Sequence, residues 1–130
     1  MLFFIFVDPT SHFAGDVQLS KLNLDERILQ LLKNIDDFKH LGDRVSELAE
    51  KYSYSESYLT HLFKSETGIA LKSYLLMRQF EYVWREVMKG RSLTDASMDA
   101  GFSSPSHFSD VFRKLTGISV TKVLESQKSQ

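Results

Sequence analysis

Hydrophobic positions recur with helical spacing from about residue 23 to residue 118, and turn-forming residues divide them into segments. The first segment predicts a helix that Asn23 caps and that carries Asp25 and Glu26 in its first turn, where acidic side chains suit the helix dipole. Its apolar stripe consists of Ile28, Leu29, Leu31, Leu32 and Ile35. A polar break over residues 36–42 ends this segment.

Two closely spaced helices are predicted next. A short one runs from about Arg44 to Lys51, with Asp43 as its cap, and a second one begins after Ser55 and ends at Gly68. Only three residues, 52–54, separate them. A short helix joined by a tight turn to a helix with small polar residues on its outer face is the helix-turn-helix pattern.

The same arrangement returns after a long predicted helix, Leu71 to Met88. Ser92 opens a short helix, residues 101–102 form the turn, and Ser104 followed by Pro105 starts another helix, which ends at Gly117. The segments 63–69 and 112–118 align as Phe, a basic residue, then Thr-Gly-Ile at the end. Two copies about fifty residues apart argue against a solenoid, which needs at least three repeats.

The N-terminal 22 residues follow a different pattern. Leu2 to Val7 is apolar and Phe-rich and stops at Asp8-Pro9, which is typical of a strand and too short to span a bilayer. We interpret residues 1–22 as the remnant of a preceding domain plus a linker; a flexible apolar tail is the alternative. Residues 23–125 then form the main domain, and residues 126–130 form a C-terminal tail.

Composition limits the classes of function. A chain of 130 residues with 42% hydrophobic content can bury the core of one domain, and the absence of cysteine fits a reducing compartment, the cytoplasm. Net charge is −1, which by itself disfavours a nucleic-acid partner. The charge is uneven, however: basic and acidic residues number 6 and 10 through Glu56, and 10 and 7 from Ser57 onward.

No motif for catalysis or for a metal is recognisable. The chain has no Gly-rich phosphate loop and no nucleophile elbow, and its four histidines lack a partner at metal-ligand spacing. We therefore expect neither an enzyme nor a metal or cofactor site.

The ordered set of motifs resembles the DNA-binding domain of AraC/XylS-type transcriptional regulators. The resemblance covers about Asp43 to Leu124. It is carried by Leu48-Ala49, by Ser55-x-x-Tyr58-Leu59-x-x-Leu62-Phe63-Lys64-x-x-Thr67-Gly68, by Tyr74 with Arg78, and by Gly101-Phe102-Ser103-x-x-x-x-Phe108-Ser109-x-x-Phe112-Arg113-x-x-x-Gly117. It implies an all-α fold of about seven helices, in which a long linker helix joins two helix-turn-helix subdomains.

The resemblance also implies a function. Both recognition helices would enter successive major grooves of double-stranded DNA, a promoter or operator, in a bacterial cytoplasm at the nucleoid. RNA polymerase would be a further partner, and oligomerisation would use an N-terminal domain that this chain lacks. A degenerate module that binds proteins instead of DNA is the competing hypothesis, and the acidic first third supports it.

Candidate contacts follow from the faces opposite the apolar stripes, and on the first recognition helix the apolar positions are Tyr58, Leu59, Leu62 and Phe63. The family resemblance implies that Ser57, Thr60 and His61 hold base-contacting positions on the first recognition helix, and we assign Lys64 to a phosphate contact. The full set there is Glu56, Ser57, Thr60, His61 and Lys64. The bland alternative is a solvated face.

On the second helix the set is Pro105, Ser106, Ser109, Asp110 and Arg113. Asp110 departs from the family, where a basic residue is common; it either accepts a hydrogen bond from cytosine or pairs with Arg113 or Lys114. Further phosphate candidates are Ser55, Arg78, Lys89, Arg91 and Ser104, of which Arg78 has a second interpretation as a bridge between helices.

Overall fold

The computed structural model describes residues 25–128, and every regular element in this range is a helix. The seven helices are α3 (Glu26–Asp36), α4 (Val45–Lys51), α5 (Glu56–Thr67), α6 (Leu71–Met88), α7 (Leu93–Asp99), α8 (Pro105–Thr116) and α9 (Val120–Lys128). The predicted all-α double helix-turn-helix fold is thereby confirmed. The strand expected at Leu2 to Val7 and the Asn23 cap lie outside the described residues.

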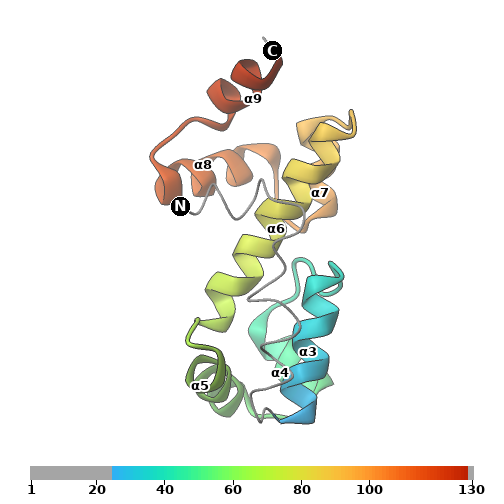
Figure 1. The fold of residues 1–130 in the computed structure, drawn as a ribbon, viewed down its shortest axis with the longest axis vertical. Coiled ribbons are helices and arrows are strands. Elements are labelled where there is room, and N and C mark those ends of the chain that lie inside the picture. The colour runs from blue at the N-terminus through green and yellow to red at the C-terminus, as the bar shows by residue number, and fades with distance from the viewer. Residues whose placement is uncertain (1–24, 129–130) are drawn as a thin grey trace.

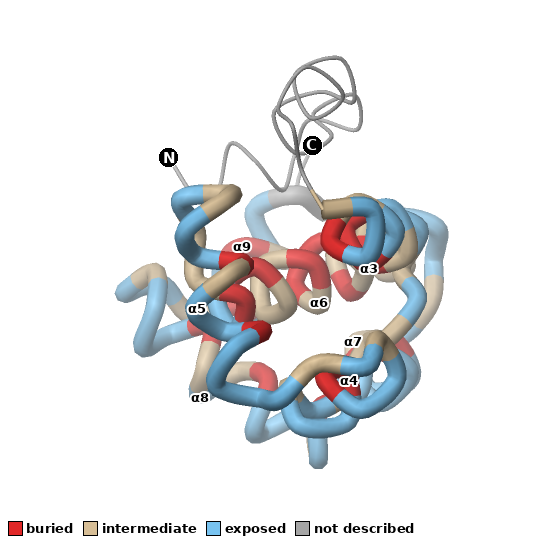
Figure 2. The backbone as a smooth tube through the Cα atoms, turned by 90° about the horizontal axis from the view of Figure 1, so that it is seen from below, coloured by how far each residue is buried: buried red, intermediate tan, exposed pale blue. Residues whose placement is uncertain are grey.

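Helix α6 joins two groups of helices. Figure 1 shows it running diagonally from α3, α4 and α5 below to α7, α8 and α9 above. Its first turns supply Leu71 and Tyr74 to the lower core, and its later turns supply Phe80 and Val83 to the upper core. The buried residues, red in Figure 2, follow α6 and the inner sides of the other helices. One helix is therefore part of both cores.

The two cores differ in composition. The lower core is mainly aliphatic, with Ile28, Leu31, Leu32, Ile35, Leu48 and Leu59 each at most 1% exposed. The upper core is built from phenylalanine: the Phe102 and Phe108 rings meet edge to face with centroids 5.1 Å apart, and Phe80 stacks on Phe102 at 5.9 Å. Such aromatic pairs add to the free energy gained by burying the rings.

Capping residues fix where the helices start and end, and the two candidate recognition helices, α5 and α8, are capped in the same way. Ser55 Oγ accepts from Tyr58 N at 3.2 Å, and Ser104 Oγ accepts from His107 N at 3.0 Å. At the far ends Gly68 and Gly117 adopt φ of 81° and 75°, which glycine tolerates without a Cβ penalty. These four predicted boundaries are confirmed.

The threonine before each of these glycines closes the turn in the same way. Thr67 Oγ1 donates to the Phe63 carbonyl at 2.7 Å, and Thr116 Oγ1 donates to the Phe112 carbonyl at 2.8 Å. Each hydroxyl also accepts from the backbone N–H two residues later. The Thr-Gly-Ile repeat of the sequence is therefore a repeat of one hydrogen-bonded helix end.

Asp25 caps α3, where its Oδ1 accepts from Arg27 N at 2.8 Å. The predicted cap of α4 was wrong. Arg44, not Asp43, holds the cap position of α4, since the Asp43 carboxylate instead accepts from Lys51 Nζ at 3.0 Å. At the other end of the chain, α9 continues to Lys128, beyond the boundary expected at residue 125.

The two helix groups also meet directly beside α6. Gly42, before α4, and Gly101, after α7, lie so close that a Cβ atom on Gly42 would sit 2.8 Å from the Gly101 Cα. The Gln79 side-chain amide donates to the Ala100 carbonyl at 2.8 Å, which ties α6 to the same turn. The second helix group is therefore anchored by more than the helix that connects it to the first.

Candidate nucleic-acid interface

The outer face of α5 is free of core contacts. All five residues expected there, Glu56, Ser57, Thr60, His61 and Lys64, are exposed. Leu59 and Phe63 are fully buried on the opposite face, so packing fixes which side of the helix reaches solvent. Lys64 Nζ donates to the Gly68 carbonyl at 3.3 Å and keeps a place near the C-terminal end of α5.

Tyr58 belongs to this exposed face as well, although its place in the motif predicted core packing. It is 53% exposed, and its ring stacks on that of Tyr54 at 5.7 Å. Arg27 lies over the other aromatic ring of the pair, with its guanidinium carbon 4.0 Å from the Tyr54 centroid. Tyr58 thus adds a flat aromatic surface next to the polar face of α5. The only feature of the sequence that could have indicated this stacked pair is the spacing of Tyr54 and Tyr58.

The outer face of α8 is similarly placed by its core residues. Phe108 and Phe112 are buried at 3% and 4% exposure, and the expected contact residues lie on the other side. Ser106, Asp110 and Arg113 are exposed, whereas Pro105 and Ser109 are partly buried. Among the described residues Asp110 forms no ion pair within 4.0 Å, neither with Arg113 nor with Lys114. The intrahelical pairing considered from the sequence is therefore absent from this structure.

Arg78 is not a surface residue, and its assignment as a phosphate contact was wrong. It is 5% exposed and forms an ion pair with the buried Glu81. Its Nη2 also donates to the Asp36 carbonyl at 2.8 Å, and its guanidinium lies 4.6 Å from the centre of the Phe38 ring. Burial with a carboxylate partner makes Arg78 a bridge between α6 and the end of α3.

Lys89 and Arg91 are placed near acidic side chains. Lys89 Nζ lies 2.9 Å from Glu86, and Arg91 Nη1 lies 3.1 Å from Glu86 and 2.7 Å from Asp99. Hydrogen bonds from these two cations lower the pKa of the Glu86 carboxyl, so it stays charged beside them. The positive charge that Lys89 and Arg91 could offer a phosphate is partly compensated within the protein.

A groove between the helix groups brings together two basic residues that the sequence did not single out. Arg44 and Lys72 are both exposed, and they line it with Gln79, Gly42 and Gly101. Arg44 lies at the start of α4, the helix that in helix-turn-helix proteins crosses the DNA backbone. No periodicity could indicate this pair, because only the packing of the two groups creates the groove.

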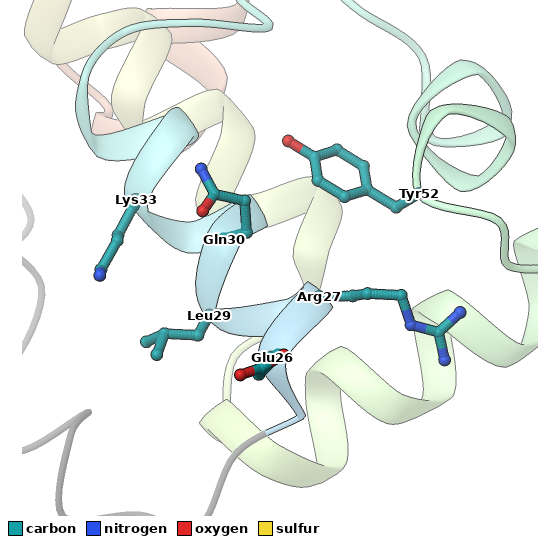
Figure 3. Close-up of a pocket in the computed structure, with 6 residues that line it drawn as sticks. All are labelled: Glu26, Arg27, Leu29, Gln30, Lys33 and Tyr52. Atoms are coloured by element: carbon teal, nitrogen blue, oxygen red, sulfur yellow. The ribbon is translucent and has the colours of Figure 1, made fainter.

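A second hollow lies on α3. Figure 3 shows its lining: Glu26, Arg27, Leu29, Gln30 and Lys33 come from α3, and Tyr52 approaches from the turn after α4. Within residues 25–128 no group of three or more His, Asp or Glu side chains is arranged to hold a metal ion. The same part of the chain contains no helix long and apolar enough to cross a membrane.

The chain is similar in sequence to known regulators. Residues 48–126 match the family described as a helix-turn-helix domain. The probable transcriptional regulator LumQ of Photobacterium leiognathi is 30% identical over 113 residues, which cover 82% of this chain and 46% of LumQ. The transcriptional regulator MxiE of Shigella flexneri is 29% identical over 103 residues, 74% of this chain and 45% of MxiE.

A third relative, the Msm operon regulatory protein of Streptococcus mutans, is 32% identical over 82 residues, which cover 61% of this chain and 29% of that protein. The chain thus spans less than half the length of these three relatives. All three carry names of regulators, and the matched family lies over both helix-turn-helix units. The chain belongs to the AraC-type helix-turn-helix family of DNA-binding transcriptional regulators.

Proposed function

We propose that this chain binds double-stranded DNA sequence-specifically by placing α5 and α8 in successive major grooves. The observation that carries the proposal is the duplication of one helix: α5 and α8 each have twelve residues, a serine cap and a left-handed glycine end. Each buries two aromatic or aliphatic side chains and leaves a polar face in solvent. The presence of two equivalent helices, each with a polar outer face, supports a partner that offers two equivalent binding positions, as successive major grooves do.

The connecting helix suits this arrangement. The 18 residues of α6 extend over about 27 Å at about 1.5 Å per residue. Recognition helices in adjacent major grooves on one side of B-DNA are about 34 Å apart. Helix α5 comes directly before α6, and α7 and α8 come after it. The length of α6 plus the turns at its ends is therefore of the order of the distance between adjacent major grooves.

The polar faces have the chemistry for both kinds of DNA contact. Thr60 and His61 can donate to or accept from base edges in the major groove, and Ser57 and Ser106 can do so at the helix starts. Lys64 and Arg113 occupy equivalent positions at the ends of the two faces and suit phosphate oxygens. The backbone amides that follow Ser55 and Ser104 also attract phosphates through the helix dipole.

A footprint tests the proposal. Duplexes selected by the full 130-residue chain from a random library would be treated with hydroxyl radicals in its presence. We expect two protected segments about one helical turn apart on one side of the duplex. A single protected segment would contradict the use of both units, and failure to select any duplex would contradict DNA binding itself.

The competing function is a protein-binding module. Its support in the structure is a set of exposed apolar side chains near the end of α8, Leu115 at 49% and Ile118 at 45% exposure. The salt dependence of binding separates the two functions. DNA binding through several phosphate contacts weakens steeply as salt rises, whereas an apolar protein interface does not.

Regulation of transcription by a longer protein, contact with RNA polymerase and oligomerisation through a preceding domain stay predictions. They depend on residues beyond the two helix-turn-helix units, and the relatives extend well past the matched region.

A further inference from the structure

The duplicated helices place two different side chains at the same position. His61 is the sixth residue of α5 and Asp110 is the sixth residue of α8, counted from equivalent serine caps. Equal helix lengths and equal ends leave no offset between the copies. The structure therefore puts the Asp110 carboxylate where the first unit puts its imidazole.

The Asp110 carboxylate forms no ion pair with the described residues of the protein. Asp110 is exposed, and the basic residues three and four positions later, Arg113 and Lys114, form no ion pair with it. Acid-base pairs at these spacings are favourable on a helix surface. A carboxylate left out of them, in the middle of the outer face of α8, is available to an outside donor.

The chemistry of a carboxylate selects one base. Ionised aspartate only accepts hydrogen bonds. In the major groove, guanine presents only acceptors and thymine presents an acceptor and a methyl group, whereas adenine presents its amino donor beside the N7 acceptor. Cytosine alone presents a donor, its N4 amino group, with no acceptor on its own edge.

We propose that Asp110 is a specificity-determining residue that accepts a hydrogen bond from the N4 amino group of a cytosine in the half-site of the second unit. The proposal rests on the DNA-binding function proposed above and adds the base preference of one half-site. His61, which can donate to guanine N7 or O6, gives the first half-site a different preference. The two half-sites therefore differ, and the chain binds its duplex in one orientation.

The test uses the full 130-residue chain and the duplex selected in the footprinting experiment. Every base pair under α8 is changed in turn to the other three, and dissociation constants are measured for the wild-type chain, Asp110→Asn and Asp110→Ala. At one position we expect the wild-type chain to prefer cytosine by about 5- to 150-fold, which corresponds to about 1–3 kcal/mol. Asp110→Asn should move that preference to adenine, whose N6 and N7 suit an amide, and Asp110→Ala should abolish it.

A matched control removes a carboxylate charge elsewhere. Glu125→Gln lies on an exposed position of α9, and we expect it to leave the cytosine preference unchanged. If both Asp110 variants instead bind all duplexes more tightly by the same factor, Asp110 acts only by repelling phosphates, and the inference is overturned while DNA binding stands. If the wild-type chain binds no duplex, the proposed function falls, and this inference falls with it.

Discussion

Gly42 and Gly101 lie backbone against backbone, although they are 59 positions apart in the sequence, and this contact links the two helix-turn-helix units. Gly42 has φ of 83° and Gly101 has φ of 93°, so both positions combine a left-handed conformation with the need for an absent Cβ. A duplex that contacts both units depends on the spacing between them. The close approach of these two glycines therefore helps to set the spacing between the two units, on which the proposed DNA binding depends.

We predict that Gly101→Ala lowers the free energy of unfolding by about 2 to 5 kcal/mol, the sum of left-handed strain and overpacking. Gly117→Ala is the matched control, because Gly117 also has positive φ but nothing lies within 4 Å of its Cβ position. It should lose only the strain, about 1 to 2 kcal/mol. Urea unfolding measures both; equal losses would show that the Gly42 contact contributes nothing.

The buried ion pair of Arg78 and Glu81 predicts a non-additive pair of substitutions. Arg78→Met leaves Glu81, which is 2% exposed, with Arg85 at 3.1 Å as a remaining partner, so the cost should not exceed the about 3–5 kcal/mol typical of an unpaired buried charge. Replacing both, as in Arg78→Met with Glu81→Leu, should destabilise less than the sum of the single changes. Denaturant unfolding of the four proteins gives the coupling energy, and strict additivity would contradict the pairing.

Base contacts from α5 predict a loss of selectivity. Thr60→Ala combined with His61→Ala should reduce discrimination between the selected duplex and mutated versions by about 1 to 3 kcal/mol for each lost contact. Thr121→Ala, at an exposed position on α9, is the control. Competition binding with the selected and mutated duplexes is the measurement, and unchanged selectivity would remove both residues from the interface.

The phosphate contact assigned to Lys64 predicts a change in salt dependence. Lys64→Ala should weaken binding to all duplexes alike and lower the slope of log affinity against log salt by about one. Lys33→Ala removes an exposed lysine of α3 and serves as the matched control. Titrations at several salt concentrations provide the slopes. An unaltered slope for Lys64→Ala would exclude this residue from the phosphate contacts.

The α3 cap predicts a pH dependence of stability. The hydrogen bond from Arg27 N lowers the pKa of Asp25 below its ordinary 3.8, burial opposes this, and the Tyr54 hydroxyl at 3.0 Å lowers it further. A pKa lowered in the folded state means that the stabilisation is present above 3.8 and is lost as pH falls through the folded-state value. Asp25→Asn should therefore flatten the acid limb of the stability curve.

The measurement is the free energy of unfolding from about pH 5 downward. Tyr54→Phe removes one of the donors to Asp25 and should give an acid limb of intermediate steepness. If Asp25→Asn and the wild-type chain lose stability in parallel, the cap carries no charge-dependent contribution.

Local signals were enough to predict much of the fold. Serine caps, Pro105 at a helix start and glycine at two helix ends act within a few residues of each boundary, and the bounds of α6 follow from its periodicity and from the stop at Lys89-Gly90. Both exposed faces followed from the apolar stripes in the same way. The family of the chain could also be inferred, because its motifs keep their order along the sequence.

The errors concern side chains whose partners lie elsewhere in the chain. Arg78 is buried because Asp36, 42 residues earlier, and Glu81 both meet its guanidinium. Asp43 is drawn from the α4 cap by Lys51, and Tyr58 stacks on Tyr54, which lies outside α5, instead of packing into the core. Periodicity along one helix carries no information about such partners.

Helix α6 packs into both cores, so its length also sets a rotational phase. One residue inserted in it would turn everything that follows by about 100° and advance it by only about 1.5 Å. In the DNA complex proposed above, the outer face of α8 would then point away from the duplex that α5 contacts. Substitutions on the exposed faces of α5 and α8 leave this rotational phase unchanged, whereas a change in the number of residues in α6 alters it.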